Sequence, residues 1–515
     1  MRSGTPPDNP AQQHNSELVA NRARRPLRLM VKLCVLLMLA GLGGCAASGE
    51  RPELNPSRWA PAAVQHEWQP GPNEQSIKLE AAPGGFDRNR PPPAAQLKYD
   101  LPALIDLALS RNPDTRQAWE TARAAAAGWG ISRAPFYPTV RVDSQNGYER
   151  IIDQVPKHWG TLKNWSSSDL LTVNYDLADF GRRDAAARSA REQLLAANLH
   201  FNRKIQEVVF TVEKSFYLLD AARANVAAAQ AIVRLAATDR RAVEKRRAAG
   251  LATKPDVLLA LQREARSRYE LENAALGVSD AQADLAVALG VRVDELPEIE
   301  SSGGQAVPAT LSGAVNGLID LAMRERPDLA ARVAALRSRD SAVELAHASM
   351  FPTVELSGYY GSHAFNYRLS NPPTPQFTAM APEYAASVAV RWDAFAGFEH
   401  MNSIEQAEAN REASRAEVYR YQLDVASQVW RAYYAFATAQ RKYQYAQALL
   451  AASQSAYDSN FGSFNHGLAT IIDLLSAERD LADAKYTMVA SRADLLISAA
   501  AVAYATGAIP PQARP

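Results

Sequence analysis

The sequence Gly250-Leu251-Ala252-Thr253 occurs a second time in this chain, as Gly467-Leu468-Ala469-Thr470. An aspartate follows each copy at the same distance, Asp256 in the first and Asp473 in the second. Both copies lie between long stretches whose apolar residues are spaced as in helices, which predicts a tight turn between two helices at each. The two turns are 217 positions apart, which is a first sign of an internal repeat.

Three further segments upstream of the turns recur at an offset of 214 positions. The three pairs are Leu104-Ile105-Asp106-Leu107-Ala108 with Leu318-Ile319-Asp320-Leu321-Ala322, Asn112-Pro113-Asp114 with Arg326-Pro327-Asp328, and Phe136-Tyr137-Pro138-Thr139-Val140 with Met350-Phe351-Pro352-Thr353-Val354. The small change of offset between these segments and the turns is one that a loop absorbs. So many collinear matches predict two tandem copies of one unit, at residues 101–310 and 311–508.

Each copy opens with a helical pattern and continues with alternating segments. The opening helices are expected at Leu101–Ala134 and Gly317–Ser349, each about 33 residues long. A proline then precedes an alternation of apolar and polar residues, which is typical of strands with two different faces. The strands are expected at about residues 139–176 and 353–393, with about 8–10 residues each and a polar loop between the two strands of each pair.

A very long helix follows the strands in each copy. From Gly181 to Gly250 there is no internal proline or glycine, and from Gly397 to Gly467 only Gly462 intervenes. Each helix would be roughly 100 Å long, and its apolar residues recur at the steps of three and four that are typical of coiled coils. A return helix of roughly 40 residues plus the opening helix matches that length, so we expect the two shorter helices to pack end to end along it. The predicted fold class is α+β, mostly α.

The composition argues against several classes of function. Lys and Arg number 56 and Asp and Glu 55, so no bulk charge favours nucleic acid as a partner. The only cysteines are Cys34 and Cys45, so the rest of the chain has neither a disulfide framework nor a thiolate metal site. The eight histidines are scattered and form no metal-binding pair, and there is no Gly-rich phosphate loop. We therefore expect neither an enzyme nor a metal or bound cofactor.

The N-terminal segment has the organisation of a bacterial lipoprotein signal. A basic stretch precedes an apolar run that is too short to span a bilayer, and the run ends in Leu42-Gly43-Gly44-Cys45. This resembles the lipobox, in which cleavage before the cysteine is followed by attachment of lipid to its sulfur. We expect residues 1–44 to be the signal peptide, with Met1 or Met30 as the start, and Cys45 to carry diacylglycerol and palmitate. Residues 45–100 are Pro-rich and predict an extended linker.

The predicted strands suggest a membrane. A two-stranded hairpin by itself is at best marginally stable, and two separate hairpins leave strand edges unpaired. Pairing with strands of other chains would close those edges, and closure is the way in which strands span a bilayer. Aromatic residues near the strand ends, among them Tyr148, Tyr360 and Trp392, suit the interfaces of a membrane. On these patterns alone, two soluble hairpins packed on helices stay possible.

At this point the sequence resembles the TolC-like outer-membrane factor family, from about Leu101 to Gly507. The resemblance rests on the doubled motifs above, taken in order, and on Asp179-Phe180-Gly181-Arg182-Arg183 after the first pair of strands. The lipobox matches the lipid-anchored branch of that family. The resemblance implies a homotrimer with a 12-stranded β-barrel in the outer membrane and a periplasmic α-barrel. Such a duct passively receives substrate from an inner-membrane pump through a periplasmic adaptor.

The resemblance also implies two sites. Gly250–Asp256 and Gly467–Asp473 match the periplasmic turns that meet the adaptor, and Asp473 matches an acidic ring at the closed entrance. Three carboxylates around a narrow axis would repel one another and select cations. The sequence departs from the family at Ser476, where a second acid can occur. Asp256 and Asp473 can also simply favour the first turn of a helix. For Asp256 we expect that capping role.

A different class of function shares many of these features. A lipid-tethered periplasmic coiled-coil scaffold or adaptor protein would have the same long hairpins and the same anchor. It would not need paired amphipathic strands in both copies. Extraction without detergent discriminates between the two classes, since removal of the lipid anchor releases a tethered soluble body but not a barrel.

Overall fold

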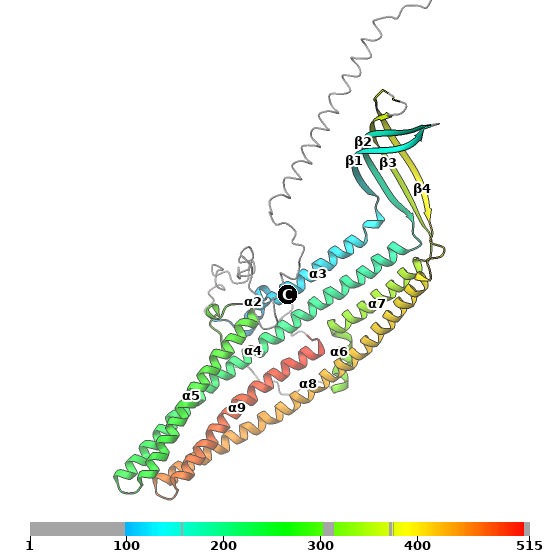
Figure 1. The fold of residues 1–515 in the computed structure, drawn as a ribbon. Helices are drawn as coiled ribbons and strands as arrows, with labels where there is room; N and C mark the ends of the chain where they lie inside the picture. Colours follow the sequence, from blue (N-terminus) through cyan, green and yellow to red (C-terminus); the bar gives the residue numbers. More distant parts are fainter. Residues whose placement is uncertain (1–97, 156–157, 302–313, 370–372, 374, 509–515) are drawn as a thin grey trace, which may run out of the picture. The chain divides into compact units, whose positions relative to one another are not determined.

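The computed structural model describes residues 98–155, 158–301, 314–369, 373 and 375–508. The predicted signal peptide, Cys45 and nearly all of the linker lie outside the described residues. In chain order the elements in Figure 1 are α2 (Leu101–Arg111), α3 (Pro113–Ser132), η4 (Ala134–Phe136), β1 (Thr139–Val155), β2 (His158–Ala178), α4 (Arg182–Ala248), α5 (Lys254–Leu289), η5 (Val293–Glu295), α6 (Val315–Glu325), α7 (Pro327–Ala348), β3 (Thr353–Leu369), β4 (Phe377–Arg391), α8 (Glu399–Asn465) and α9 (Ile471–Thr506).

The long helices confirm the prediction from the repeat. α4 and α8 each contain 67 residues, and the return helices α5 and α9 each contain 36. α4 packs against both α3 and α5, and α8 packs against both α7 and α9, so two shorter helices do pair with one long helix in each repeat. Contacts of α4 with α7 and α9 join the two repeats side by side.

The opening helix of each repeat is two helices and not the single helix that was predicted. Asn112 separates α2 from α3, and Arg326 separates α6 from α7. Both residues have extended backbone, with ψ of 126° and 118°, because the proline that follows each of them disfavours the helical conformation. The proline itself then suits the first position of the new helix.

Different side chains close these two breaks. In the first repeat the Asn112 side chain accepts a bond from the Asp114 amide at 2.8 Å and donates one to the Ala288 carbonyl, also at 2.8 Å. In the second repeat Arg326 donates to the Ala505 carbonyl at 3.2 Å and to both oxygens of Asp328 at 3.0 and 2.6 Å.

The Arg326 guanidinium is 1% exposed and sits in a network that crosses three helices. Arg203 from α4 lies 3.0 Å from Asp328, and the Tyr421 hydroxyl from α8 donates to the same carboxylate at 2.8 Å. Burial alone would raise the pKa of Asp328, but the hydrogen bonds and charges of Arg326 and Arg203 hold it at about 2. The network therefore ties α4, α7 and α8 together at the break.

The four strands form one antiparallel sheet in the order β1-β2-β3-β4. β2 pairs with β3 over most of its length, so the two hairpins are joined edge to edge. The predicted strand lengths were too short: the strands contain 17, 21, 17 and 15 residues. The ladder between β1 and β2 continues from Thr139–Asn174 to Val155–His158, because the polar segment expected to be a loop still alternates and pairs.

The apolar core of the helical part lies in separate clusters. One joins α2, α4 and the end of α5, with Leu104, Val212 and Leu289 fully buried. Another lies near the turns, where Val243 and Leu474 from the two repeats pack together. α9 is long and apolar enough to pass a test for a membrane span, but it packs along α8 and α4 in the helical part.

Candidate functional site at the helical turns and on the sheet

The first functional element is the turn between α4 and α5. Gly250 has φ of +75°, a left-handed conformation that side chains disfavour, and the Leu251 amide donates to the Arg246 carbonyl at 2.8 Å. Thr253 then caps α5, since its hydroxyl accepts from the Asp256 amide while Asp256 accepts from the Thr253 amide at 2.7 Å. This leaves the Leu251 side chain 68% exposed at the end of the hairpin.

The turn between α8 and α9 repeats this geometry. Gly467 has φ of +80°, and the Leu468 amide donates to the Ser463 carbonyl at 2.8 Å. Thr470 caps α9, and the Asp473 carboxylate accepts from the Thr470 amide at 3.0 Å and from its hydroxyl at 2.7 Å. Leu468 is 83% exposed and Ile472 68% exposed, so this turn presents an apolar surface. Ala252 and Ala469 are half-buried beneath their turns.

Asp256 and Asp473 therefore have the same local role. Each completes a capping box, and in each the bonds from the preceding threonine lower the pKa of the carboxyl. The capping role expected of Asp256 is confirmed. Asp473 has it as well, so the cap does not set the two residues apart. A gate role for Asp473 stays a prediction.

The two hairpins are bonded to each other close to the turns. An Arg246 guanidinium nitrogen donates to the Phe464 carbonyl across the two repeats. One layer further from the turns, the Tyr457 hydroxyl of α8 donates to Asp239 of α4 at 2.9 Å, and Arg263 of α5 lies 3.2 Å from Glu478 of α9. All four long helices thus contribute one side chain to this layer.

The layer contains two carboxyl groups with no exposure to solvent, Asp239 and Glu478. Burial raises the pKa of both carboxyl groups, with that of Glu478 rising from its ordinary 4.5 to about 7. Arg263 opposes the rise in the pKa of Glu478, while burial and then the Asp239 carboxylate raise the pKa of Tyr457. No sequence motif predicts this cluster, since its members come from four separate helices.

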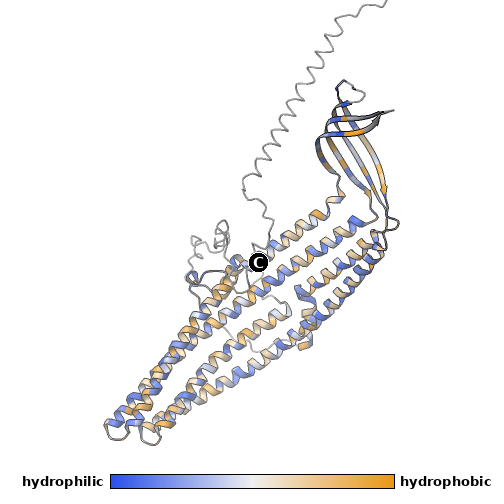
Figure 2. Cartoon of the chain, in the orientation of Figure 1, coloured by the Kyte–Doolittle hydropathy of each residue, from blue (hydrophilic) through white to orange (hydrophobic). Residues whose placement is uncertain are grey.

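Where the strands adjoin the helices, the sheet has one largely apolar face; further along the strands the same face carries Ser144, which donates to Asp169 at 2.6 Å. Cross-strand pairs place Val142 beside Leu171, Leu171 beside Tyr360 and Tyr360 beside Tyr384, which puts an apolar row across all four strands. On the other face Thr172 bonds to Asp143 at 3.0 Å. Figure 2 shows hydrophobic and hydrophilic residues alternating along the strands. Val142 is 77% and Tyr384 75% exposed, so the apolar face is uncovered in the protomer.

The segment Asp179–Arg183 forms the strand-to-helix junction of the first repeat. The Asp179 carboxylate accepts from the amides of Gly181 and Arg183, and Arg183 donates to the Asp176 carbonyl at 2.7 Å. Phe180 has φ of +52°, and its counterpart Phe398 has φ of +68°. The junction thus turns the chain from the sheet into each long helix.

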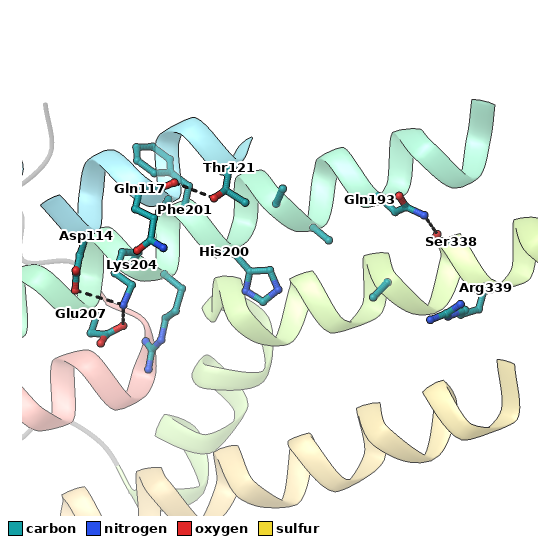
Figure 3. Close-up of a pocket in the computed structure, with 15 residues that line it drawn as sticks. Asp114, Gln117, Thr121, Gln193, His200, Phe201, Lys204, Glu207, Ser338 and Arg339 are labelled. Atoms are coloured by element: carbon teal, nitrogen blue, oxygen red, sulfur yellow. Dashed lines mark hydrogen bonds and ion pairs between the residues drawn. The ribbon is translucent and has the colours of Figure 1, made fainter. Parts of the chain in front are cut away.

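Figure 3 shows an open groove of about 670 Å³ lined by α3, α4 and α7. Lys204 lies 2.9 Å from Glu207 and 3.9 Å from Asp114, and Gln193 donates to Ser338 at 3.3 Å. Burial and the charge of Arg332 lower the pKa of His200, which also lines the groove. Lys204 and Gln193 of α4 are thus paired with polar side chains along the seam between the repeats.

Comparison with known proteins identifies the class to which this fold and these sites belong. The sequence pattern of the outer membrane efflux protein family matches residues 104–291 and 318–508. Protein CyaE of Bordetella pertussis is 29% identical over 421 residues, covering 81% of this chain and 86% of CyaE. Outer membrane protein OprJ of Pseudomonas aeruginosa is 27% identical over 51% of this chain and 55% of OprJ.

Solved structures of low sequence identity share the fold. The outer-membrane channel OprN superposes with a TM-score of 0.68 at 21% identity, over 79% of this chain and 89% of OprN. The outer membrane protein VceC from Vibrio cholerae superposes with a TM-score of 0.66 at 21% identity, over 79% of this chain and 96% of VceC.

The chain belongs to the outer membrane efflux protein family, and the family pattern matches each of its two repeats separately. It is an outer-membrane channel protein of an efflux system, with the TolC-like fold that the sequence predicted. The family consists of transport ducts rather than enzymes.

Proposed function

We propose that three copies of this chain form a passive duct through the outer membrane and the periplasm. The observation that carries the proposal is the four-stranded sheet: its order leaves β1 and β4 as edges, and within the described residues no other strand pairs with either edge. Pairing β4 of one copy with β1 of the next removes every edge. The uncovered apolar face then meets lipid, and the polar face lines the lumen.

Exposed apolar side chains on α8, α3 and α5 support the same assembly. On α8, exposed aromatic and leucine side chains recur at intervals of eleven residues, close to three helical turns, and so share one face. They are Tyr419 with Trp430, and Leu423 with Tyr434 and Tyr445. At the opposite edge Trp119 of α3 and Leu258 and Tyr269 of α5 are also exposed. These two apolar edges would cover each other between neighbouring protomers.

The two turns are the proposed contact with a periplasmic adaptor, which connects the duct to an inner-membrane pump. In each repeat the long helix begins after the strands and ends at the turn. The two turns carry the exposed residues Leu251 and Leu468. Relatives named for pyoverdine export, toluene efflux and antibiotic efflux all match this chain, so we propose that the pump and adaptor select the cargo. The duct itself requires no cofactor.

Cys45 is the proposed attachment site of the lipid that adds a membrane anchor to the barrel. Its support is the Leu42-Gly43-Gly44-Cys45 motif after a basic and apolar leader. Growth with labelled palmitate should label the wild-type protein and leave Cys45→Ala unlabelled.

The proposed gate is tested by conductance of the purified protein in a planar lipid bilayer. We expect Asp473→Ala to raise conductance and lower cation preference, because a ring of three carboxylates would be lost from the axis. Asp256→Ala is the matched control, since it removes an identical cap without a proposed position on the axis.

Wild-type conductance in both variants would reject the gate role of Asp473 and leave the channel function standing. Equal changes in both would assign the effect to loss of a helix cap. A protein that neither forms a trimer nor inserts into the bilayer would reject the duct and favour the lipid-tethered scaffold.

A further inference from the structure

The two helical turns differ strongly in charge although they share one backbone geometry. Residues 240–256 contain six Lys and Arg against two Asp and Glu, a net charge of +4. The equivalent residues 457–473 contain no Lys or Arg and two Asp, a net charge of −2. The charge is therefore not a requirement of the turn itself, because the second turn forms without it.

Four of the six cations are exposed and have no acidic partner. Arg241, Lys245, Arg247 and Lys254 are all exposed, and no carboxylate of the described residues lies within ion-pair distance of any of them. Arg241 bonds only within its own helix, to the Ala237 carbonyl and the Thr238 hydroxyl. These four residues, which we call the cationic tip, flank the exposed Leu251.

The other two cations have structural partners. Arg240 lies 2.5 Å from both Glu244 and Glu264, and Arg246 donates to the Phe464 carbonyl of the neighbouring hairpin. The acidic residues of this turn are thus already engaged, since Asp256 caps α5. The uncompensated charge belongs to the cationic tip.

Helix dipoles explain only part of this arrangement. Lys245 and Arg247 stand in the last turn of α4, where a positive charge is favourable. Lys254 is the first residue of α5, where the dipole disfavours a cation. Arg241 and Lys245 are four residues apart on one helix, so their like charges repel. Lys254 and the repulsion between Arg241 and Lys245 thus cost local stability, and a partner of opposite charge would offset that cost.

We propose that the cationic tip is a docking surface for an acidic segment of the periplasmic partner protein. The inference rests on the proposed function of the turns and adds the chemistry of the contact. The first turn attracts its partner through charge around Leu251, whereas the second offers the apolar pair Leu468 and Ile472. One protomer therefore presents two unlike surfaces, and a partner must carry an acidic region and an apolar region in the matching order.

The test uses the full-length protein in detergent and two synthetic helical peptides as probes. One peptide is rich in glutamate, and the other has glutamine at each glutamate. Binding is measured by fluorescence anisotropy at low and at physiological salt. We expect the acidic peptide to bind preferentially, and Arg241→Gln/Lys245→Gln/Arg247→Gln/Lys254→Gln to weaken it about tenfold and to remove most of its salt dependence.

Two control variants isolate the position and the charge of the cationic tip. The variant Arg241→Lys/Arg247→Lys keeps the charge of the cationic tip and should keep the wild-type affinity for the acidic peptide. A second variant removes four exposed cations elsewhere on α4 and α8, and it should bind as the wild type does. Its substitutions are Lys214→Gln, Arg431→Gln, Arg441→Gln and Lys442→Gln.

Equal binding of the two peptides, or wild-type affinity in the variant with four glutamines at the cationic tip, would overturn the proposal. So would tip-dependent binding to vesicles containing phosphatidylglycerol without any preference for the acidic peptide, because the surface would then face lipid. Bilayer conductance of the same preparations tests the duct independently: conductance without preference for the acidic peptide rejects only this inference.

Discussion

The break between the short helices is closed by a neutral amide in the first repeat and by a buried ion network in the second. Asn112 and Arg326 occupy equivalent positions, precede equivalent prolines and both bond to the end of a return helix. Only Arg326 requires a counter-charge, which Asp328 supplies while it also pairs with Arg203. The comparison shows that proline and a carbonyl-directed donor are sufficient for the break, and that the buried charges are particular to the second repeat.

Removing the two side chains should give the largest difference between the repeats. Arg326→Ala should destabilise the protein by about 3–5 kcal/mol, because Asp328 keeps a buried charge with one partner fewer. Asn112→Ala should cost about 1–2 kcal/mol, the loss of a cap and one neutral hydrogen bond. The midpoint of thermal unfolding, followed by circular dichroism of the purified protein, checks both.

A triple variant identifies the cause of the larger effect. Arg203→Leu/Arg326→Leu/Asp328→Leu removes the three charges of the network together and should recover part of the lost stability, since an uncompensated buried charge is then absent. If Arg326→Ala and Asn112→Ala were equally mild, the ion network would be dispensable and the two breaks energetically alike.

The layer of buried carboxyls gives the next prediction. Glu478 has no exposure, whereas its counterpart in the first repeat, Leu261, is 42% exposed. Between pH 4.5 and about 7 the folded protein retains a proton at Glu478 that the unfolded chain has released. Stability should therefore fall as the pH rises through this window, by an amount on the order of 1–3 kcal/mol.

The midpoint of thermal unfolding, measured at several pH values, tests whether stability falls as the pH rises. Glu478→Gln should reduce the pH dependence, because the amide does not titrate, and leave the part that belongs to Asp239, whose pKa is also raised. Leu261→Gln introduces the same side chain at the equivalent position and should leave the slope as in the wild type. A wild-type stability that rises over the window would show that ion pairing with Arg263 outweighs burial.

The smallest expected effect concerns a feature that the repeats share. Thr253→Ala and Thr470→Ala each remove one capping box and should each cost about 1 kcal/mol. Because the two caps have the same geometry, the two changes in midpoint should agree. A clear inequality would show that one turn is stabilised further by its neighbours, contrary to the local account of both.

Much of the fold could be predicted because it depends on local chemistry. The αL glycines at 250 and 467, the threonine caps and the absence of proline from the long helices act within a few residues, and repetition made each signal visible twice. The breaks at Asn112 and Arg326 were missed, although the following prolines signal them, because the apolar pattern continues across both. Strand lengths were underestimated, since alternation in polar sequence is a weak signal.

The candidate site could be predicted only where it coincides with a motif. The turns at 250–256 and 467–473 lie where the doubled sequence places them, and Asp256 and Asp473 make the caps that their positions favour. The Asp239–Glu478 layer could not be found, because its partners are 239 residues apart and become neighbours only when two hairpins pack. Interactions between repeats depend on tertiary structure that no single repeat encodes.

The equal lengths of the paired helices limit how this chain can change during evolution. α4 and α8 each have 67 residues, and α5 and α9 each have 36. An insertion of two helical turns in both arms of one hairpin would move its end roughly 10 Å past the other. The bonds between Arg246 and Phe464 and between Tyr457 and Asp239 would then be lost. Insertions and deletions are therefore tolerated in the helical part only when all four helices acquire them in step.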